Sequence, residues 1–84
     1  MNLRDQINLN LEVHGDIEFI FENNHYFIGW NRQEDGYAIL ISPGNELAVS
    51  HTDNWSDALD QPIFRNELSI NDVFDQVKFT ALTV

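Results

Sequence analysis

The segment "DIEFIFENNHYFIGWN", residues 16 to 31, constrains the fold more than any other part of the chain. Two runs of alternating apolar and polar residues flank the pair Asn23 and Asn24, and this pattern is typical of a β-hairpin. Asn tolerates the positive φ angles that a two-residue turn requires, so we place the turn at these two residues. The hairpin then pairs Ile20 with Phe27 across its two strands.

One face of this hairpin is apolar along its whole length, and we expect it to line the core. Because side chains alternate between the faces of a strand, a one-residue slip would move the whole set to the other side. The set consists of Ile17, Phe19, Phe21, Tyr26, Ile28 and Trp30. The opposite face, which should be polar, nevertheless carries Ile20 and Phe27. The same register also sets His25 opposite Glu22, as a cross-strand pair.

A third strand is expected over residues 37 to 42, "YAILIS", after a turn at residues 33 to 36. With its odd-numbered residues in the core, Leu40 joins the second face of the hairpin. We call the set of Ile20, Phe27 and Leu40 the apolar island.

A fourth short strand is expected over residues 46 to 51, after a Pro- and Gly-containing turn at residues 42 to 45. Leu47 and Val49 are placed on its inward side. The sequence therefore predicts a local antiparallel meander of about four strands.

Two helices are predicted after the meander. The first covers residues 52 to 62, with Thr52 or Asp53 as its N-cap and Pro62 as its stop signal. The second begins at Ser69, with Asp72 three residues later as an approximate capping box. Its apolar residues repeat at helical spacing, at Ile70, Val73, Phe74 and Val77.

The two ends of the chain allow alternatives. Residues 7 to 13, "INLNLEV", alternate in polarity and favour a strand. A helix that follows Asn2 is the alternative, because three apolar residues are also spaced by four: Leu3, Ile7 and Leu11. The tail, residues 78 to 84, either extends the last helix or forms an edge strand.

Length and composition limit the class of protein. Eighty-four residues make one domain, residues 1 to 84, which we classify as α+β. Fourteen Asp and Glu against four Lys and Arg give a net charge of −10, which disfavours binding to nucleic acid or to anionic membranes. The chain has no cysteine, no basic start followed by an apolar run and no long apolar stretch. A cytoplasmic protein is therefore expected.

No motif for catalysis or cofactor binding is present, and we expect neither an enzyme nor a bound cofactor. His14, His25 and His51 do not have the spacing of a metal-binding helix. His51 and Asp53 supply two potential metal ligands, whereas a metal site needs three or four.

The order of elements also resembles that of a loose group of small uncharacterised proteins from low-GC Gram-positive bacteria and their mobile elements. This group combines a leading helix, a hairpin of the type "IEF-x-(turn)-x-Y-x-I", a further strand and a helical C-terminal segment. The matching residues are Ile17, Glu18, Phe19, Tyr26, Ile28, Leu59, Pro62, Ile63 and Leu68. The resemblance implies a helix at the N-terminus and specifies no activity. Phe27 and the tail beyond Val77 depart from it.

Two features remain as candidate binding sites. Asp53, Asp57 and Asp60 would share one face of the first predicted helix, and we call them the acidic ridge. The ridge is either a solvated outer face or a surface for a basic protein, as in an inhibitor or immunity protein that blocks a nucleic-acid-binding partner.

The apolar island has two explanations of its own. Either the N-terminal helix covers it, or it binds another protein or a second copy of the chain as a weak homodimer. The sequence therefore favours a non-enzymatic, acidic interaction module, and we prefer the second explanation of the island.

Overall fold

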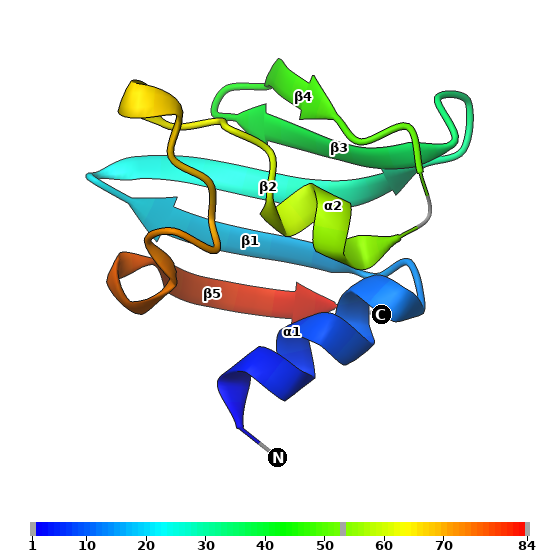
Figure 1. Cartoon of the computed structure of the whole chain (residues 1–84), viewed down its shortest axis with the longest axis horizontal. Coiled ribbons are helices and arrows are strands. Elements are labelled where there is room, and N and C mark those ends of the chain that lie inside the picture. Colours follow the sequence, from blue (N-terminus) through cyan, green and yellow to red (C-terminus); the bar gives the residue numbers. More distant parts are fainter. Residues whose placement is uncertain (1, 53, 84) are drawn as a thin grey trace.

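A five-stranded antiparallel sheet is the base of the computed structural model, which describes residues 2–52 and 54–83 (Figure 1). The strands are β1 (Asp16–Phe21), β2 (Asn24–Asn31), β3 (Gly36–Ile41), β4 (Asn45–Val49) and β5 (Lys78–Thr83). Their order is β4-β3-β2-β1-β5. The predicted α+β class and the four-stranded meander are therefore confirmed, and the tail adds a fifth strand beside β1.

The N-terminus forms helix α1 (Leu3–Glu12), so the strand that the alternation favours there is wrong. The side chain of Asn2 caps the helix by accepting a hydrogen bond from the amide of Asp5 at 2.8 Å. Ile7 and Leu11 are fully buried against the sheet, whereas Leu9 between them is exposed. The structure therefore follows the helical spacing of Ile7 and Leu11, which are four residues apart, and not the alternation that predicts a strand.

The first predicted C-terminal helix is present as the shorter α2 (Trp55–Leu59). Asn54 caps it through a hydrogen bond from the amide of Ser56, so Thr52 is not the cap, and Asp53 lies outside the described residues. The helix ends at Leu59, three residues before Pro62.

The second predicted C-terminal helix is wrong, although its capping box forms. The Asp72 carboxylate accepts hydrogen bonds from the amide and the hydroxyl of Ser69, at 2.8 and 3.1 Å. The backbone then leaves helical geometry at Val73, and only short 3-10 turns occur in this region, η1 (Arg65–Glu67) and η2 (Phe74–Gln76). The chain continues directly into β5, whose pairing with β1 satisfies the backbone of the tail.

The hairpin turn lies one residue earlier than predicted, at Glu22 and Asn23, which have φ angles of 50° and 66°. Its register is therefore displaced by two residues, and Phe27 faces Glu18 instead of Ile20. Because the displacement is even, every side chain stays on its predicted face.

Two side-chain pairings change with the register. His25 lies opposite Ile20, so the predicted pairing of His25 with Glu22 is wrong. Glu22 instead forms an ion pair with Arg65.

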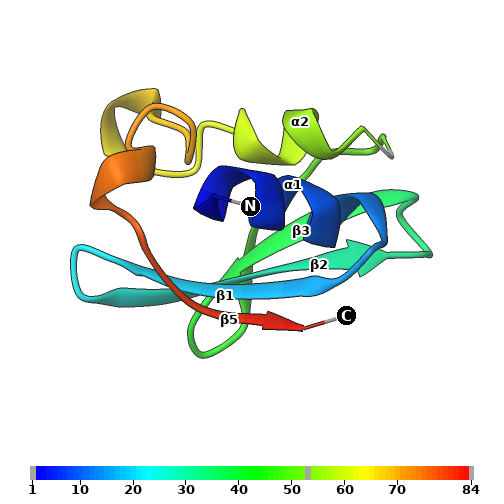
Figure 2. The same cartoon turned by 90° about the horizontal axis from the view of Figure 1, so that it is seen from below.

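The helices and the C-terminal turns cover only one face of the sheet. Figure 2 shows α1, α2 and the connecting segment on the same side, above β1, β2 and β5. Between these layers lies one apolar core, which includes Ile7, Leu11, Ile17, Phe19, Ile28, Tyr37, Ile39, Leu59 and Ile70.

Strand β4 does not place its side chains as predicted, because its pairing with β3 is interrupted by a bulge beside Ile39 and Leu40. Leu47 is consequently exposed, and Val49 pairs with Ala38 on the face opposite to the core. Both residues were expected to point inward.

Candidate functional site

The sheet surface opposite the helices, which we call the open face, carries the apolar island. Phe27 and Leu40 are direct cross-strand neighbours on β2 and β3. Ile20 lies diagonally from Phe27, since its own neighbour on β2 is His25. All three island side chains are half-buried. The other residues of the open face include Asp16, Glu18, His25, Gly29, Asn31, Ala38, Glu46, Val49, Lys78, Ala81 and Thr83.

Helix α1 does not cover the island, so this explanation of the second apolar face is wrong. Its buried residues, Ile7 and Leu11, belong to the core on the other side of the sheet. Within residues 2–52 and 54–83, no helix lies over the open face (Figure 2).

The ring of Phe27 is folded down onto Gly29. A Cβ atom at Gly29 would lie 2.7 Å from Cε1 of Phe27, which is closer than such atoms approach. The absence of a side chain at Gly29 therefore lets the ring lie flat on β2, where it is half-buried without a covering element. Sequence reasoning found Phe27 but missed the role of this glycine.

Two shallow hollows flank Phe27 and Leu40, with volumes of about 210 and 330 Å³. The smaller hollow is bordered by Glu18, His25 and the β3–β4 turn at residues 42–44. The larger is bordered by residues that include Asp16, Asn31, Arg32 and Ala38. Because Phe27 and Leu40 line both hollows, they form a ridge between them.

Charge is distributed unevenly around the molecule. The open face and its margin carry three carboxylates, those of Asp16, Glu18 and Glu46, with two cations, Arg32 and Lys78. Ten further carboxylates of the described chain belong to the helices, the turns and the connecting segments. The open face is therefore close to neutral in a chain whose net charge is −10.

Of the three residues of the acidic ridge, only Asp57 lies within a helix of the described chain. Asp57 lies in α2 and accepts a hydrogen bond from the Thr52 hydroxyl at 2.7 Å. Asp60 follows the end of α2 and accepts one from the Asn71 amide at 2.6 Å, while Asn71 accepts one from Arg4 at 2.7 Å. Asp53 lies outside the described residues. Both described carboxylates thus have structural partners that sequence reasoning missed.

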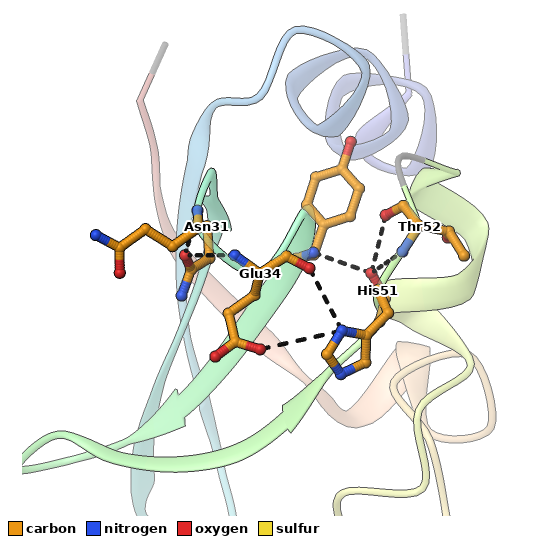
Figure 3. Close-up of polar contacts among 7 residues, drawn as sticks. Asn31, Glu34, His51 and Thr52 are labelled. Atoms are coloured by element: carbon orange, nitrogen blue, oxygen red, sulfur yellow. Dashed lines mark hydrogen bonds and ion pairs between the residues drawn. The ribbon is translucent and has the colours of Figure 1, made fainter.

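Two of the histidines have structural contacts. The ring of His14 stacks on Trp30, with 3.9 Å between the centroids and 4° between the planes. Nδ1 of His51 lies 3.3 Å from the carbonyl oxygen of Glu34 and 4.0 Å from its carboxylate (Figure 3). In the part of the chain that the structure describes, no three His, Asp or Glu residues are grouped as metal ligands.

The contacts in Figure 3 join the β2–β3 turn to the loop after β4. Asn31 accepts hydrogen bonds from the amides of Gln33 and Glu34, at 3.0 and 3.2 Å. The hydroxyl of Ser50 accepts one from the amide of Tyr37 at 2.9 Å and donates one to the carbonyl of Thr52 at 3.0 Å. These contacts hold two connecting segments together and account for the polar residues at this end of the sheet.

A third hollow, of about 380 Å³, lies beside the tip of the β1–β2 hairpin. The ion pair between Arg65 and Glu22 is at its border, with Tyr26 and Phe64 behind it. Burial, with a smaller contribution from the charge of Glu22, raises the pKa of the Tyr26 hydroxyl above its ordinary value.

Comparisons of the chain with protein-family models, with curated proteins and with solved structures gave no match. None of the described helices is long and apolar enough to cross a membrane.

Proposed function

We propose that this chain is a non-enzymatic module that binds another protein through the open face. The observation that carries the proposal is the position of the apolar island, which lies on a sheet face that no described helix covers. An apolar centre inside a polar rim is the usual composition of a protein-binding surface. A cytoplasmic location, in keeping with a sequence without cysteine, belongs to the same proposal.

The rim of the open face supplies groups that can fix the orientation of a partner. Asp16 and Glu18 lie on β1, Lys78 lies on β5 opposite Ile20, and Arg32 borders the larger hollow. Both signs of charge are therefore present around the island. Such groups contribute more to selectivity than to affinity, because they remain solvated until a partner presents matching charges.

The two edges of the sheet are less suited to binding than its face. Strand β4 is short and bulged, and β5 begins with Lys78 and pairs with β1 through a second irregularity. Short strands, bulges and edge lysines all hinder the addition of a further strand. This supports contact through side chains of the open face rather than through an added strand.

Photo-crosslinking from two matched positions tests the proposal. A photoreactive residue would replace Ile20 on the open face or, as the control, the exposed Leu9 on α1, in cells that naturally make the chain. We expect protein adducts from position 20 and few from position 9. Equal yields at both positions, or none at position 20, would contradict a binding role of the open face.

The charge distribution supports a second candidate function, in which the acidic helical side binds a basic protein. Seven described carboxylates lie in α1, α2 and the segments after α2, so negative charge accumulates on the helical side. An inhibitor or immunity protein that blocks a nucleic-acid-binding partner would use such a surface. Its complex should weaken as salt rises, because the attraction between opposite charges is screened.

A further inference from the structure

We propose that the open face packs against the open face of a second copy of this chain, forming a weak dimer with two-fold symmetry. This inference rests on the proposed function, since it names the partner of the same surface. Two observations support a second copy over an unrelated protein, the shape of the face and its charge, and the size of the face indicates how strong the dimer can be.

The shape of the open face is suited to pairing with itself. A two-fold interface requires that one surface carry both a protruding and a receiving part. Here the half-buried Phe27 and Leu40 lie between two hollows of about 210 and 330 Å³, so apolar side chains and receiving spaces occur side by side on one face. In the dimer, the ridge of each copy lies in a hollow of the other, and each contact occurs twice.

The charge distribution selects this face for contact between like molecules. Two copies that each carry a net charge of −10 repel one another, and the repulsion is greatest between their helical sides. Contact through the nearly neutral open face keeps the partner copy away from the seven described carboxylates of α1, α2 and the segments after α2. The same geometry brings Lys78 or Arg32 within reach of the partner's acidic rim.

The size of the open face sets the strength of the dimer. With strands about 4.8 Å apart and a rise of about 3.3 Å per residue, five strands outline a face of roughly 400–500 Å². Two such faces bury about 900 Å², below the roughly 1,200–2,000 Å² of stable complexes. We therefore expect a dissociation constant on the order of 10–100 micromolar and a monomer at low concentration.

Sedimentation equilibrium of three proteins over a concentration series, up to about 1 mM, tests the dimer. The parent chain should show a reversible monomer–dimer equilibrium. Phe27→Asp should raise the dissociation constant at least about tenfold, because it places a charge at the centre of the contact. Leu9→Asp adds the same charge to an exposed apolar position on α1 and should change the dissociation constant much less, because it acts only through the net charge.

Several outcomes would overturn the proposal. A parent chain that stays monomeric throughout the series excludes the dimer. A dimer that survives Phe27→Asp, or that is lost in Leu9→Asp, places the contact elsewhere on the molecule.

A dilution series of the parent chain, followed by NMR, requires no variant and remains informative if Phe27→Asp does not fold. The methyl and ring signals of Ile20, Phe27 and Leu40 should shift with concentration, while those of the core residues Ile7 and Leu59 should stay constant. Shifts confined to α1, or no shifts, would contradict the proposal.

The salt dependence of the dimer is an independent test of the proposal. Raising the salt concentration from about 0.05 to about 0.5 M should strengthen the dimer, because it screens the repulsion between two acidic molecules. A dimer that weakens with salt would be held mainly by attraction between opposite charges and would contradict a contact centred on the apolar island.

The crosslinking experiment separates failure of the dimer from failure of the proposed function. Adducts of position 20 with a different protein, from a chain that is monomeric in solution, exclude the dimer and retain the binding role. Adducts of position 20 with the chain itself support both proposals. A monomeric chain without adducts excludes both.

Discussion

The two faces of the sheet are made by the same strands and yet have opposite environments. Phe19 and Ile20 are consecutive residues of β1, but Phe19 is 1 % exposed, whereas Ile20 on the open face is only half-buried. Phe19 stacks on Tyr26, with 5.0 Å between ring centroids, and also contacts Phe64 and Phe79. Phe27 on the open face has instead the glycine beside it and two hollows.

Packing within the fold explains why the covered face is apolar, but it does not explain the apolar residues of the open face. Every large apolar side chain on the covered face belongs to the core or packs against it. The three island residues are half-buried and are not part of that core. A binding role would account for them, which is why the predictions compare the two faces.

The largest expected effect is that of Phe19→Ala on the covered face. We expect it to lower the free energy of unfolding by about 3–5 kcal/mol, the usual loss for truncating a buried aromatic residue. A domain of this size has a total stability of about 4–13 kcal/mol, so at the lower end of this range much of the variant should be unfolded. Urea denaturation followed by tryptophan fluorescence measures the change.

Phe27→Ala is the matched variant on the open face, and it should cost about 1 kcal/mol when measured at concentrations where the chain is monomeric. If the two variants lose equal stability, the open face is an internal core after all, and the distinction between the faces fails.

The strand faces were predictable from the sequence even though the register was not. Placing the turn at Asn23 and Asn24 displaced the pairing by two residues, but the alternation has a period of two. Ile20, Phe27 and Leu40 were therefore assigned to the correct face with partly incorrect neighbours. The hollows and the contact between Phe27 and Gly29 depend on the true neighbours, so the sequence could not reveal them.

The C-terminal third was less predictable, because tertiary pairing overrides helical spacing there. Ile70, Val73 and Val77 are buried as their pattern suggests, but they lie in turns that lead into β5. The free edge of β1 supplies hydrogen bonds that a longer helix would not use. The predicted position of Asp60 on a helix face is also wrong, since α2 ends at Leu59 and Asp60 is its C-cap.

Alanine substitutions at Gly36 of β3 and Gly29 of β2 test the comparison of the two faces with a smaller expected effect on stability. A Cβ atom at Gly36 would lie 2.3 Å from the backbone nitrogen of His51, and a rigid backbone cannot move aside at low cost. We expect Gly36→Ala to lower the unfolding free energy by about 1–3 kcal/mol. Thermal melts of this variant beside Gly29→Ala measure the contrast.

Gly29→Ala should change stability much less, because its Cβ atom meets the mobile end of the Phe27 ring. The ring would swing away from the strand and change the ridge formed by Phe27 and Leu40. Self-association should therefore weaken without any added charge. A variant that is strongly destabilised, or one that associates as the parent does, would contradict this role of Gly29.

Tyr37→Phe tests how firmly α1 is held on the covered face. The Tyr37 hydroxyl donates a hydrogen bond to the carbonyl oxygen of Leu11, which also accepts one from the amide of His14. Because that carbonyl keeps a second donor, we expect a loss of only about 0.5–1.5 kcal/mol. Hydrogen exchange should show faster exchange in α1 than in β2. Uniformly faster exchange in both would mean that the helix and the sheet unfold as one unit.

The smallest effect on stability is expected from the acidic ridge, yet it distinguishes best between the two candidate surfaces. Replacing Asp53, Asp57 and Asp60 together by Asn should shift the melting temperature little, because Asn can still accept the hydrogen bonds from Thr52 and Asn71. The variant loses three negative charges, so the repulsion between copies falls and the dimer should become tighter. A complex of the acidic side with a basic protein should instead become weaker and lose its salt dependence. Sedimentation equilibrium and binding measurements at two salt concentrations separate these outcomes.

If the triple variant binds its partner as tightly as the parent does, the acidic ridge is a solvated surface, and the open face remains the binding surface.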